Sequence, residues 1–406
     1  MATDPKKKAQ TKAKSQVKKQ VKKAAKKNPG IVIALVALVI VVVVVAVVLY
    51  LKVPAVHDAV ENIISRQSST NNGANNNTNQ GGNSNLVLGE GELKVHFIDV
   101  GQGDCIYIQF PDGKDMLIDC GSEGKKNMPA SVLTNLQSRI TDGKLDYLML
   151  THSDLDHVGY MDEVLANFVV STIYMPNIKA SYSGYATDIN NLDPAKLALF
   201  TDEDTINTEA YATFFIAALS EEDCQIVLNV DDDDTHNKIV ISDNTTYNLT
   251  FYCMTAAKWA STNLNSAEKK NAVSPIGILE YNGKRIVLTG DSNERNEPDF
   301  VSRVGSIDCD VLKVGHHGSQ TSSTASFLAA ITCEYAVFCC GTGNDYDHPR
   351  QAAIDRMSSY TALYRTDLNG NIVLTIDANG ELSFAMDNEN VTQEQERIGA
   401  DTAKAA

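Results

Sequence analysis

Residues 145–157 read LDYLMLTHSDLDH, an apolar run that leads into histidines and aspartates. Its first part, Leu145–Leu150, is largely apolar and is typical of a buried strand. Four potential metal ligands follow within six residues, and they are His152, Asp154, Asp156 and His157. A rigid strand that runs straight into a short loop can aim all four side chains into one pocket, and histidine with carboxylate suits divalent transition ions. An Asp- and His-rich surface loop is the alternative, but such groups packed against a buried strand are costly without compensation. The stretch therefore predicts a metal site at a strand end.

Two further segments repeat this order of strand and then ligand. The apolar run Arg285–Leu288 precedes Asp291, and Val311–Val314 precedes His316 and His317. Other strand-like runs and one helix-like run lie upstream: Leu93–Val100, Cys105–Phe110 and Asp115–Cys120 as strands, and Pro129–Ile140 as a helix with proline at its first position. Alternating strands and helices with chemistry at strand ends indicate a layered α/β domain. The segment from about 180 to 270 shows no regular pattern.

Several motifs together resemble a known family. HSDLDH (152–157) is similar to the His-x-His-x-Asp-His signature of the metallo-β-lactamase fold, with Asp154 where the second histidine usually stands. The flanking motifs resemble the hydrolase domain of the competence protein ComEC and its free-standing relatives: FIDVGQGD (97–104), LIDCG (117–121), LTGD (288–291), LKVGHHGS (312–319) and HP (348–349). The resemblance covers roughly residues 93 to 385. It implies a four-layer αββα fold, expected over residues 93–387.

The resemblance also implies two divalent metal ions, Zn²⁺ or Mn²⁺. His152 and Asp154 would bind one ion, Asp156 and His157 the second, and Asp291 would bridge the two. One of His316 and His317 would complete the second site, with His317 taken as the ligand, and the other would contact the scissile phosphate or donate a proton. The residues expected in catalysis are Asp156, His316 and His317. Asp119 resembles the family's strand-end aspartate that orients a ligand or the loop, and three more residues are expected either behind the ligands or around the pocket: Asp99, Asp104 and His348.

Two departures from the family pattern affect the metal. Asp154 in place of histidine makes the site harder, so manganese competes with zinc. His236 is the only further histidine between the 152–157 loop and Asp291, and its setting in DDDDTH (231–236) is that of a solvated acidic loop. The first ion is then expected to be weakly bound or completed by water. The neighbouring Asp231–Asp234 lacks the alternation of a calcium loop, and Gly101–Asp104 links two strands, which favours a turn over a phosphate-binding loop.

The N-terminal region predicts a membrane anchor. Residues 1–30 form a basic tail with eleven lysines, and residues 31–51 are free of charge and largely apolar. A transmembrane helix needs about 20 such residues. A cleaved signal peptide is the alternative, but its apolar region would be shorter, roughly 7 to 15 residues. Lysines before the span favour a cytoplasmic N-terminus and an extracellular hydrolase domain. Residues 52–92 are expected to be a polar flexible linker and residues 388–406 a disordered tail.

Charge and cysteine usage bound the function classes. Residues 93–406 hold 22 Lys or Arg and 46 Asp or Glu, a net charge of −24. Eight cysteines could pair in an oxidising compartment, yet the settings of Cys120, Cys339 and Cys340 are those of buried strand positions, so reduced core cysteines are expected. Tight DNA binding draws on Lys and Arg, and a small basic strip beside the metal would have to supply it, with Lys313, Arg350 and Arg365 as candidate members.

The expected function is a membrane-anchored, metal-dependent hydrolase that uses a metal-activated water. Phosphodiester cleavage is favoured because ComEC-like proteins are associated with nuclease or phosphoesterase chemistry, so a DNA substrate is one option. An envelope phosphodiester, such as a teichoic-acid or phosphocholine linkage, suits the expected location equally well. A non-catalytic adaptor that retains the fold is the alternative from another class. Protein partners cannot be identified from the sequence.

Overall fold

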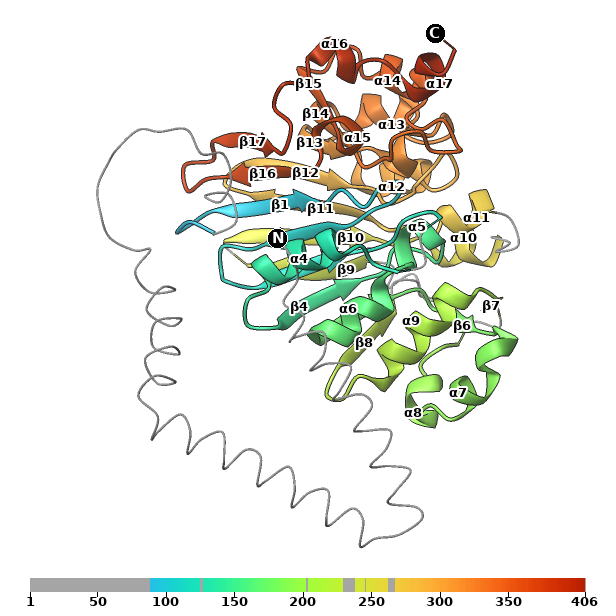
Figure 1. Cartoon of the computed structure of the whole chain (residues 1–406). Helices are drawn as coiled ribbons and strands as arrows, with labels where there is room; N and C mark the ends of the chain where they lie inside the picture. Colours follow the sequence, from blue (N-terminus) through green and yellow to red (C-terminus); the bar gives the residue numbers. More distant parts are fainter. Residues whose placement is uncertain are drawn as a thin grey trace, which may run out of the picture. The chain divides into compact units, whose positions relative to one another are not determined.

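The computed structural model describes residues 88–124, 127–201, 204–228, 238–244, 246–261 and 267–405 (Figure 1). The expected basic tail, the span at 31–51, most of the linker and His236 lie outside these residues. Among the described helices, none has the length and apolar character that crossing a bilayer requires.

The first sheet has eight strands in the order β17-β16-β1-β2-β3-β4-β5-β8. Strands β3, β4, β5 and β8 run parallel to one another, so the residues that follow β3 and β4 meet at one edge of the sheet. The bounds are β1 Leu93–Phe97, β2 Ile106–Gln109, β3 Asp115–Ile118, β4 Lys144–Met149, β5 Val169–Met175, β8 Gln225–Leu228, β16 Ile372–Ile376 and β17 Leu382–Met386. The strands expected at the start of the domain and at Leu145–Leu150 are confirmed to within three residues at their ends.

The second sheet has seven strands in the order β15-β14-β13-β12-β11-β10-β9. Strands β12 to β15 are parallel, so Asp291 after β12 and His316 after β13 also emerge at one edge. The bounds are β9 Lys238–Asp243, β10 Tyr247–Tyr252, β11 Ile276–Tyr281, β12 Lys284–Leu288, β13 Cys309–Lys313, β14 Cys333–Phe338 and β15 Ala362–Arg365.

Three separate apolar cores divide the domain into four layers. The two sheets enclose one core, which contains Phe97 of β1 and Val311 of β13. A second core joins the outer face of the first sheet to α4 (Ala130–Arg139), α6 (Met161–Asn167) and α9 (Glu209–Ser220). The third joins the other sheet to α12 (Glu297–Val304), α13 (Ala325–Ala330) and α14 (Gln351–Arg356). Figure 1 shows these two helix groups on opposite sides of the sheets. The expected α/β fold is confirmed.

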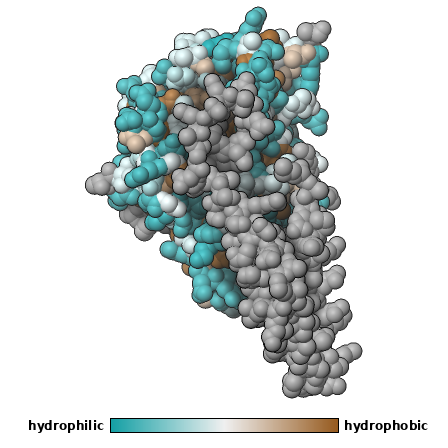
Figure 2. All heavy atoms as spheres, turned by 60° about the vertical axis from the view of Figure 1, so that its left-hand side comes forward, coloured by the Kyte–Doolittle hydropathy of each residue, from teal (hydrophilic) through white to brown (hydrophobic). Residues whose placement is uncertain are grey.

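The shorter elements include those of the region without a sequence pattern. They are α5 Leu155–Val158, β6 Lys179–Ala180, η1 Ser183–Tyr185, α7 Ala186–Asn190, α8 Pro194–Leu197, β7 Thr205–Ile206, α10 Ala256–Ser261, α11 Ala267–Asn271, η2 Gly315–Gly318, α15 Thr366–Asn369, α16 Gln393–Glu396 and α17 Ala400–Ala403. Hydrophilic side chains cover most of the described surface visible in Figure 2, in keeping with the domain's many charges.

The C-terminal segment corrects one expectation. Residues 388–405 are ordered and carry α16 and α17, rather than forming a disordered tail. Glu396 is buried, and the Arg397 guanidinium donates to the Tyr360 carbonyl at 2.8 Å. Sequence composition suggested fraying because the segment is polar, but several of its polar groups are hydrogen-bonded to the domain.

The cysteines are free thiols, as expected, with the exception of one pair. Cys120, Cys339 and Cys340 are free and buried, as their settings predicted. Cys309 and Cys333 instead form a disulfide between the first residues of the neighbouring strands β13 and β14. The expectation fails for this pair because strand register, which sequence spacing does not reveal, brings their Cα atoms to 4.6 Å.

Candidate metal centre

Four predicted ligands from three strand ends meet between the two sheets. The ligand atoms of Asp156, His157, Asp291 and His317 all lie within 4.8 Å of one another. His317 Nε2 is 3.2 Å from Asp156 Oδ2 and 3.5 Å from Asp291 Oδ1. His157 Nε2 is 3.1 Å from the same Asp291 oxygen. Because the loops after β4, β12 and β13 open at facing sheet edges, residues more than a hundred positions apart converge here.

His152 approaches the other oxygen of Asp291. Its side chain is fully buried and its Nε2 lies 3.8 Å from Asp291 Oδ2. Within the described part of the chain this nitrogen has no hydrogen-bond partner. The other ring nitrogen, Nδ1, is 3.1 Å from Thr151 Oγ1 and 3.3 Å from Ser274 Oγ, so the ring is held from behind. A buried imidazole nitrogen without a partner is costly, and a metal ion would relieve that cost.

Asp154 lies at the rim rather than in the four-ligand cluster. It lines the pocket, and Lys270 Nζ is 3.7 Å from its Oδ1. Burial, together with the charge of Asp156, raises its pKa to about 6. Lys270 was not identified from the sequence, since it belongs to α11 in the region without a pattern.

Asp119 orients His157, as predicted. Its carboxylate accepts hydrogen bonds from the Thr151 backbone N–H at 2.7 Å and from the Thr151 hydroxyl at 2.7 Å. Its Oδ2 lies 2.8 Å from His157 Nδ1. A carboxylate only accepts, so the proton is on Nδ1 and Nε2 is left to face the metal site. Asp119 adopts φ 55°, which is strained for a residue with a Cβ.

His317 is held in a similar way and lies deeper than His316. Its Nδ1 donates to the Cys339 carbonyl at 2.7 Å, which directs Nε2 toward the ligand cluster. His316 Nε2 lies 3.6 Å from Asp291 Oδ2, and the Asn271 amide lies 3.0 Å from the same nitrogen. The His317 side chain is 1% exposed, whereas that of His316 is 20% exposed and faces the pocket. The geometry therefore distinguishes the two histidines, whose separate roles the sequence left open.

The histidine pair sits on a strained backbone. His316 has φ 49° and His317 has φ 55°, so two consecutive residues with a Cβ occupy the left-handed region. Each such residue costs about 1–3 kcal/mol and persists only where surrounding structure enforces it. The two side chains consequently leave the chain in different directions, one into the cluster and one toward the pocket.

The pocket above the cluster has a volume of about 390 Å³. Its lining residues are Gln102, Glu123, Asp154, Leu155, Asp156, Asn271, Asp291, His316, His317, Tyr346 and His348. The predicted pocket residue His348 is among them, and its ring centroid lies 5.3 Å from that of His316. Glu123, Asn271 and Tyr346 were missed, because none of them stands in a motif at a strand end.

Three sequence expectations around the pocket are wrong. Asp99 is exposed and caps a turn, where its Oδ1 accepts from the Gly101 N–H at 2.9 Å. Lys313 is fully buried and paired with Asp104, 2.7 Å away. Arg365 is also buried and paired with Asp367. Lys313 and Arg365 therefore do not form a basic strip. Asp104 lies behind His317, with its Oδ1 3.4 Å from His317 Nδ1, which is one of the two positions expected for it.

Glycines allow the ligand loop to pack against its neighbours. A Cβ on Gly103 would lie 2.4 Å from the Asp156 carbonyl oxygen, and one on Gly121 would lie 2.5 Å from that of Leu155. Gly103 also has φ 155°. The turn after β1 is therefore a packing element, as expected from its place between two strands.

The charges of the centre favour a cation. Burial alone would lower the pKa of His157, but Asp291 and Asp119 raise it well above its usual value. Burial likewise opposes the charge of His317, while Asp291, with Asp104 and Asp156, raises its pKa to about 10. Imidazole binds a metal only when neutral, so a divalent ion would replace these protons at the same carboxylates. The donor set of two imidazoles and two carboxylates, with the unpartnered His152 nitrogen beside it, fits divalent transition ions.

Comparison with known proteins places this site in a family. The chain is 27% identical over 295 residues to ComE operon protein 3 of Bacillus subtilis, a match that covers 69% of this chain and 33% of that protein. It is 38% identical over 123 residues to competence protein ComA of Neisseria gonorrhoeae, covering 29% and 18% respectively. The chain thus spans a third or less of these relatives' length.

Among solved structures, the metallo-β-lactamase fold protein YhfI of Bacillus subtilis aligns with a TM-score of 0.39 and 13% identity, over 72% of this chain and 100% of that one. The family model of the metallo-β-lactamase superfamily matches residues 98–232 and 274–342, which include the predicted ligands from His152 to His317. The chain is a member of the metallo-β-lactamase superfamily, with relatives among the ComEC-type competence proteins.

Proposed function

We propose that this domain hydrolyses phosphodiester bonds at a centre of two divalent metal ions. One observation carries the proposal. The two carboxylate oxygens of Asp291 face different histidines: Oδ1 faces His157 and His317 at 3.1 and 3.5 Å, and Oδ2 faces His152 and His316 at 3.8 and 3.6 Å. A carboxylate between two such ligand sets suits a bridging role.

The residues then take separate roles. Asp156, His157 and His317 would hold one ion, and His152 with Asp154 the other, weakened by the neighbouring Lys270. His316 is the more exposed of the two glycine-flanked histidines and faces the pocket, which suits contact with the scissile phosphate or donation of a proton. When bound, two such ions acidify a water molecule and stabilise the charge that develops on the attacked phosphorus.

The surroundings support an anionic, base-containing substrate. The lining of a groove of about 200 Å³ includes one acidic residue, Glu294, and three cationic residues, Lys258, Lys269 and Arg295. It adjoins the metal pocket through α11, where Lys269 lines the groove and Asn271 the pocket. On the loop after β14, Tyr346 is 44% exposed and stacks on His348 at 5.6 Å. Cationic side chains bind phosphates, and an exposed aromatic ring stacks on bases. Their presence side by side favours single-stranded nucleic acid over an envelope polymer as the substrate.

The same proposal includes the location. We take the apolar stretch 31–51 as the anchor of an extracellular domain, and the Cys309–Cys333 disulfide supports this, because disulfides persist mainly in oxidising compartments. Digestion of intact cells with a membrane-impermeant protease tests the location. Cleavage of the domain only after lysis would overturn it.

The test of the activity uses bis(p-nitrophenyl) phosphate with added Mn²⁺ or Zn²⁺. We expect turnover by the wild type and a loss of more than about a hundredfold in Asp156→Ala and Asp291→Ala, beyond the roughly 10–100-fold that removing a residue behind a ligand typically costs. Retention of full turnover by both variants would overturn the proposal. A purified domain that retains no divalent ion would favour a non-catalytic adaptor.

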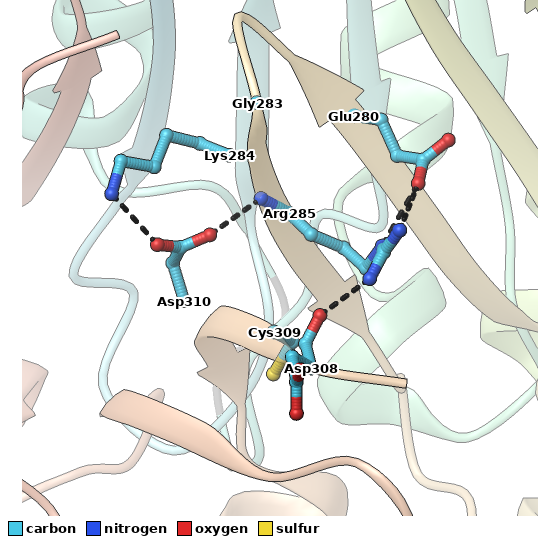
Figure 3. A pocket seen from close by; sticks show the side chains of 7 residues that line it. All are labelled: Glu280, Gly283, Lys284, Arg285, Asp308, Cys309 and Asp310. Carbon is cyan, nitrogen blue, oxygen red and sulfur yellow. Dashed lines mark hydrogen bonds and ion pairs between the residues drawn. The ribbon is translucent and has the colours of Figure 1, made fainter. Parts of the chain in front are cut away.

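The choice of substrate is tested separately. Lys258→Glu and Arg295→Glu are expected to raise KM for a single-stranded oligonucleotide while leaving bis(p-nitrophenyl) phosphate turnover unchanged. Lys284→Glu is the matched control, because Lys284 pairs with Asp310 at 2.9 Å in a pocket at the other end of β12 (Figure 3). Equal or better cleavage of a glycerol-phosphate polymer would favour the envelope substrate.

A further inference from the structure

The loop of residues 344–350, here called the His348 loop, forms one wall of the metal pocket and is shaped by Asn344. The Asn344 side-chain oxygen accepts from the backbone N–H groups of Tyr346 at 3.1 Å and His348 at 2.9 Å. Its amide nitrogen donates to the carbonyls of Gly341 at 2.8 Å and His348 at 2.5 Å. One side chain thus satisfies four backbone groups, so the loop depends on how Asn344 is held.

The C-terminal segment holds this loop from the outside. Lys404 Nζ donates to the Asn344 carbonyl at 2.8 Å and lies 2.5 Å from Asp347 Oδ1. The Ala400 N–H donates to the Pro349 carbonyl at 2.9 Å. The segment therefore contacts the loop at its start, its middle and its end.

The segment is in turn fixed to the body of the domain. Gln351, the first residue of α14, exchanges hydrogen bonds with it: its Nε2 donates to the Arg397 carbonyl at 3.0 Å, and its Oε1 accepts from the Gly399 N–H at 2.9 Å. A Cβ on Gly399 would lie 2.5 Å from Gln351 N, so the close approach requires glycine. The buried Arg365 guanidinium also donates to the Ile398 carbonyl.

The inner side of the loop packs on the histidine pair. The Arg350 N–H donates to the Gly318 carbonyl at 2.9 Å, directly after His317. A Cβ on Gly318 would lie 2.6 Å from Pro349 Cβ, which leaves no space between the two turns. The His348 ring centroid lies 5.3 Å from that of His316 and 6.4 Å from that of His317. A shift of the loop would therefore change the pocket.

We infer that the C-terminal segment, residues 393–405, positions the active site: through Lys404 it fixes the His348 loop and so the places of Tyr346 and His348 beside the metal centre. The inference rests on the proposed function for its effect on catalysis. Lys404 is 48% exposed, and exposed ion pairs contribute little to stability. Its loss should therefore affect the pocket more than the melting temperature.

The test compares Lys404→Ala and Lys404→Arg with Lys284→Ala, which removes a lysine from another carboxylate pair far from the loop. Three quantities are measured on the full chain: hydrogen exchange of residues 341–350, binding of inorganic phosphate to the Mn²⁺-loaded protein, and kcat and KM for bis(p-nitrophenyl) phosphate. We expect Lys404→Ala to raise exchange in the loop and to lower phosphate affinity and kcat, each several-fold, at unchanged metal content and melting temperature. Lys404→Arg should restore most of the loss, and Lys284→Ala should change none of these quantities.

A double variant tests whether the effect passes through His348. In a His348→Ala background, most of the effect of Lys404→Ala on kcat or phosphate affinity should disappear, since coupled residues are not additive. Unchanged loop exchange in Lys404→Ala would overturn the inference. So would raised exchange with phosphate affinity and kcat both unaltered. An inactive wild type would remove the proposed function instead, and loop exchange with phosphate binding would still decide the positioning role.

Discussion

Lys313 places its ammonium nitrogen 2.7 Å from Asp104 Oδ2, and both side chains are buried behind the metal centre. Burial alone would lower the pKa of Lys313, but the Asp104 charge outweighs it and raises that pKa. Asp104 Oδ1 also lies 3.4 Å from His317 Nδ1. The two charges therefore neutralise each other, Asp104 supports the predicted ligand His317, and neither Asp104 nor Lys313 is available to a substrate.

Removing one member of this pair should be strongly destabilising. Lys313→Met leaves the Asp104 charge buried without its partner, and we expect a loss of about 3–5 kcal/mol in the free energy of unfolding. Urea denaturation measures the loss. The double variant Lys313→Met with Asp104→Leu should recover a large part of it. A single-variant loss below about 1 kcal/mol would mean that the pair is solvated in solution.

Asp119 should govern metal affinity without touching the metal. Asp119→Asn keeps the shape of the side chain but removes the carboxylate that holds His157 Nδ1. We expect the affinity for Zn²⁺ or Mn²⁺ to fall about 10–100-fold, as for other residues that orient a ligand. Titration calorimetry measures it, with Asp99→Asn as the matched control because Asp99 lies in an exposed turn. Equal affinities in the two variants would contradict this role.

Metal binding should release protons at neutral pH. Against the opposing effect of burial, Asp291 and its neighbours raise the pKa of His317 to about 10 and that of His157 well above its usual value. Both imidazoles are therefore protonated near pH 7 before the metal binds and must be neutral afterwards. Apparent affinity should rise from pH 6 to pH 9. Calorimetry in buffers of different ionisation enthalpy counts the protons, and a count of zero at pH 7 would mean that both imidazoles are already neutral before the metal binds.

The Cys309–Cys333 disulfide should stabilise the second sheet. It closes a loop with a sequence separation of 24 residues, so by loop entropy its removal should cost about 3 kcal/mol. The variant Cys309→Ala with Cys333→Ala is compared with wild type by urea denaturation, with and without reductant. Reductant should lower the stability of the wild type and leave the double variant unchanged. Equal sensitivity in both proteins would mean that the disulfide is absent in solution.

The sequence predicted the elements whose signals are local. Strand β4 was expected at Leu145–Leu150 and is Lys144–Met149, and α4 was expected at Pro129–Ile140 and is Ala130–Arg139. Apolar runs and helix-start residues suffice for such elements because the hydrogen bonds and burial they imply follow the chain. The region around 180–270 was not predicted. Its short elements β6, η1 and α7 pack against α9, and its strands β9 and β10 take their places by pairing in the second sheet.

For side chains at strand ends, the residue type indicated the possible chemistry, but the sequence did not predict what surrounds each side chain. Asp99 and Asp104 belong to one motif, yet the first caps an exposed turn and the second is buried against Lys313. Lys313 was interpreted as part of a basic strip because a lysine at a strand end is usually solvated. Its partner lies more than 200 positions away, and no local pattern records such a pairing.

The types of the ligands and their order along the chain follow from the sequence: histidines and carboxylates stand directly after apolar strands, in the pattern of one superfamily. The three-dimensional arrangement adds that Asp291 turns one oxygen to each set of histidines, that His317 lies deeper than His316, and that Lys404 contacts the loop of His348. The reason is the distance along the chain over which each effect acts. Backbone propensity and hydrophobic periodicity act over a few residues, whereas the distances between ligands depend on how two sheets pack and on strained turns that the whole domain enforces.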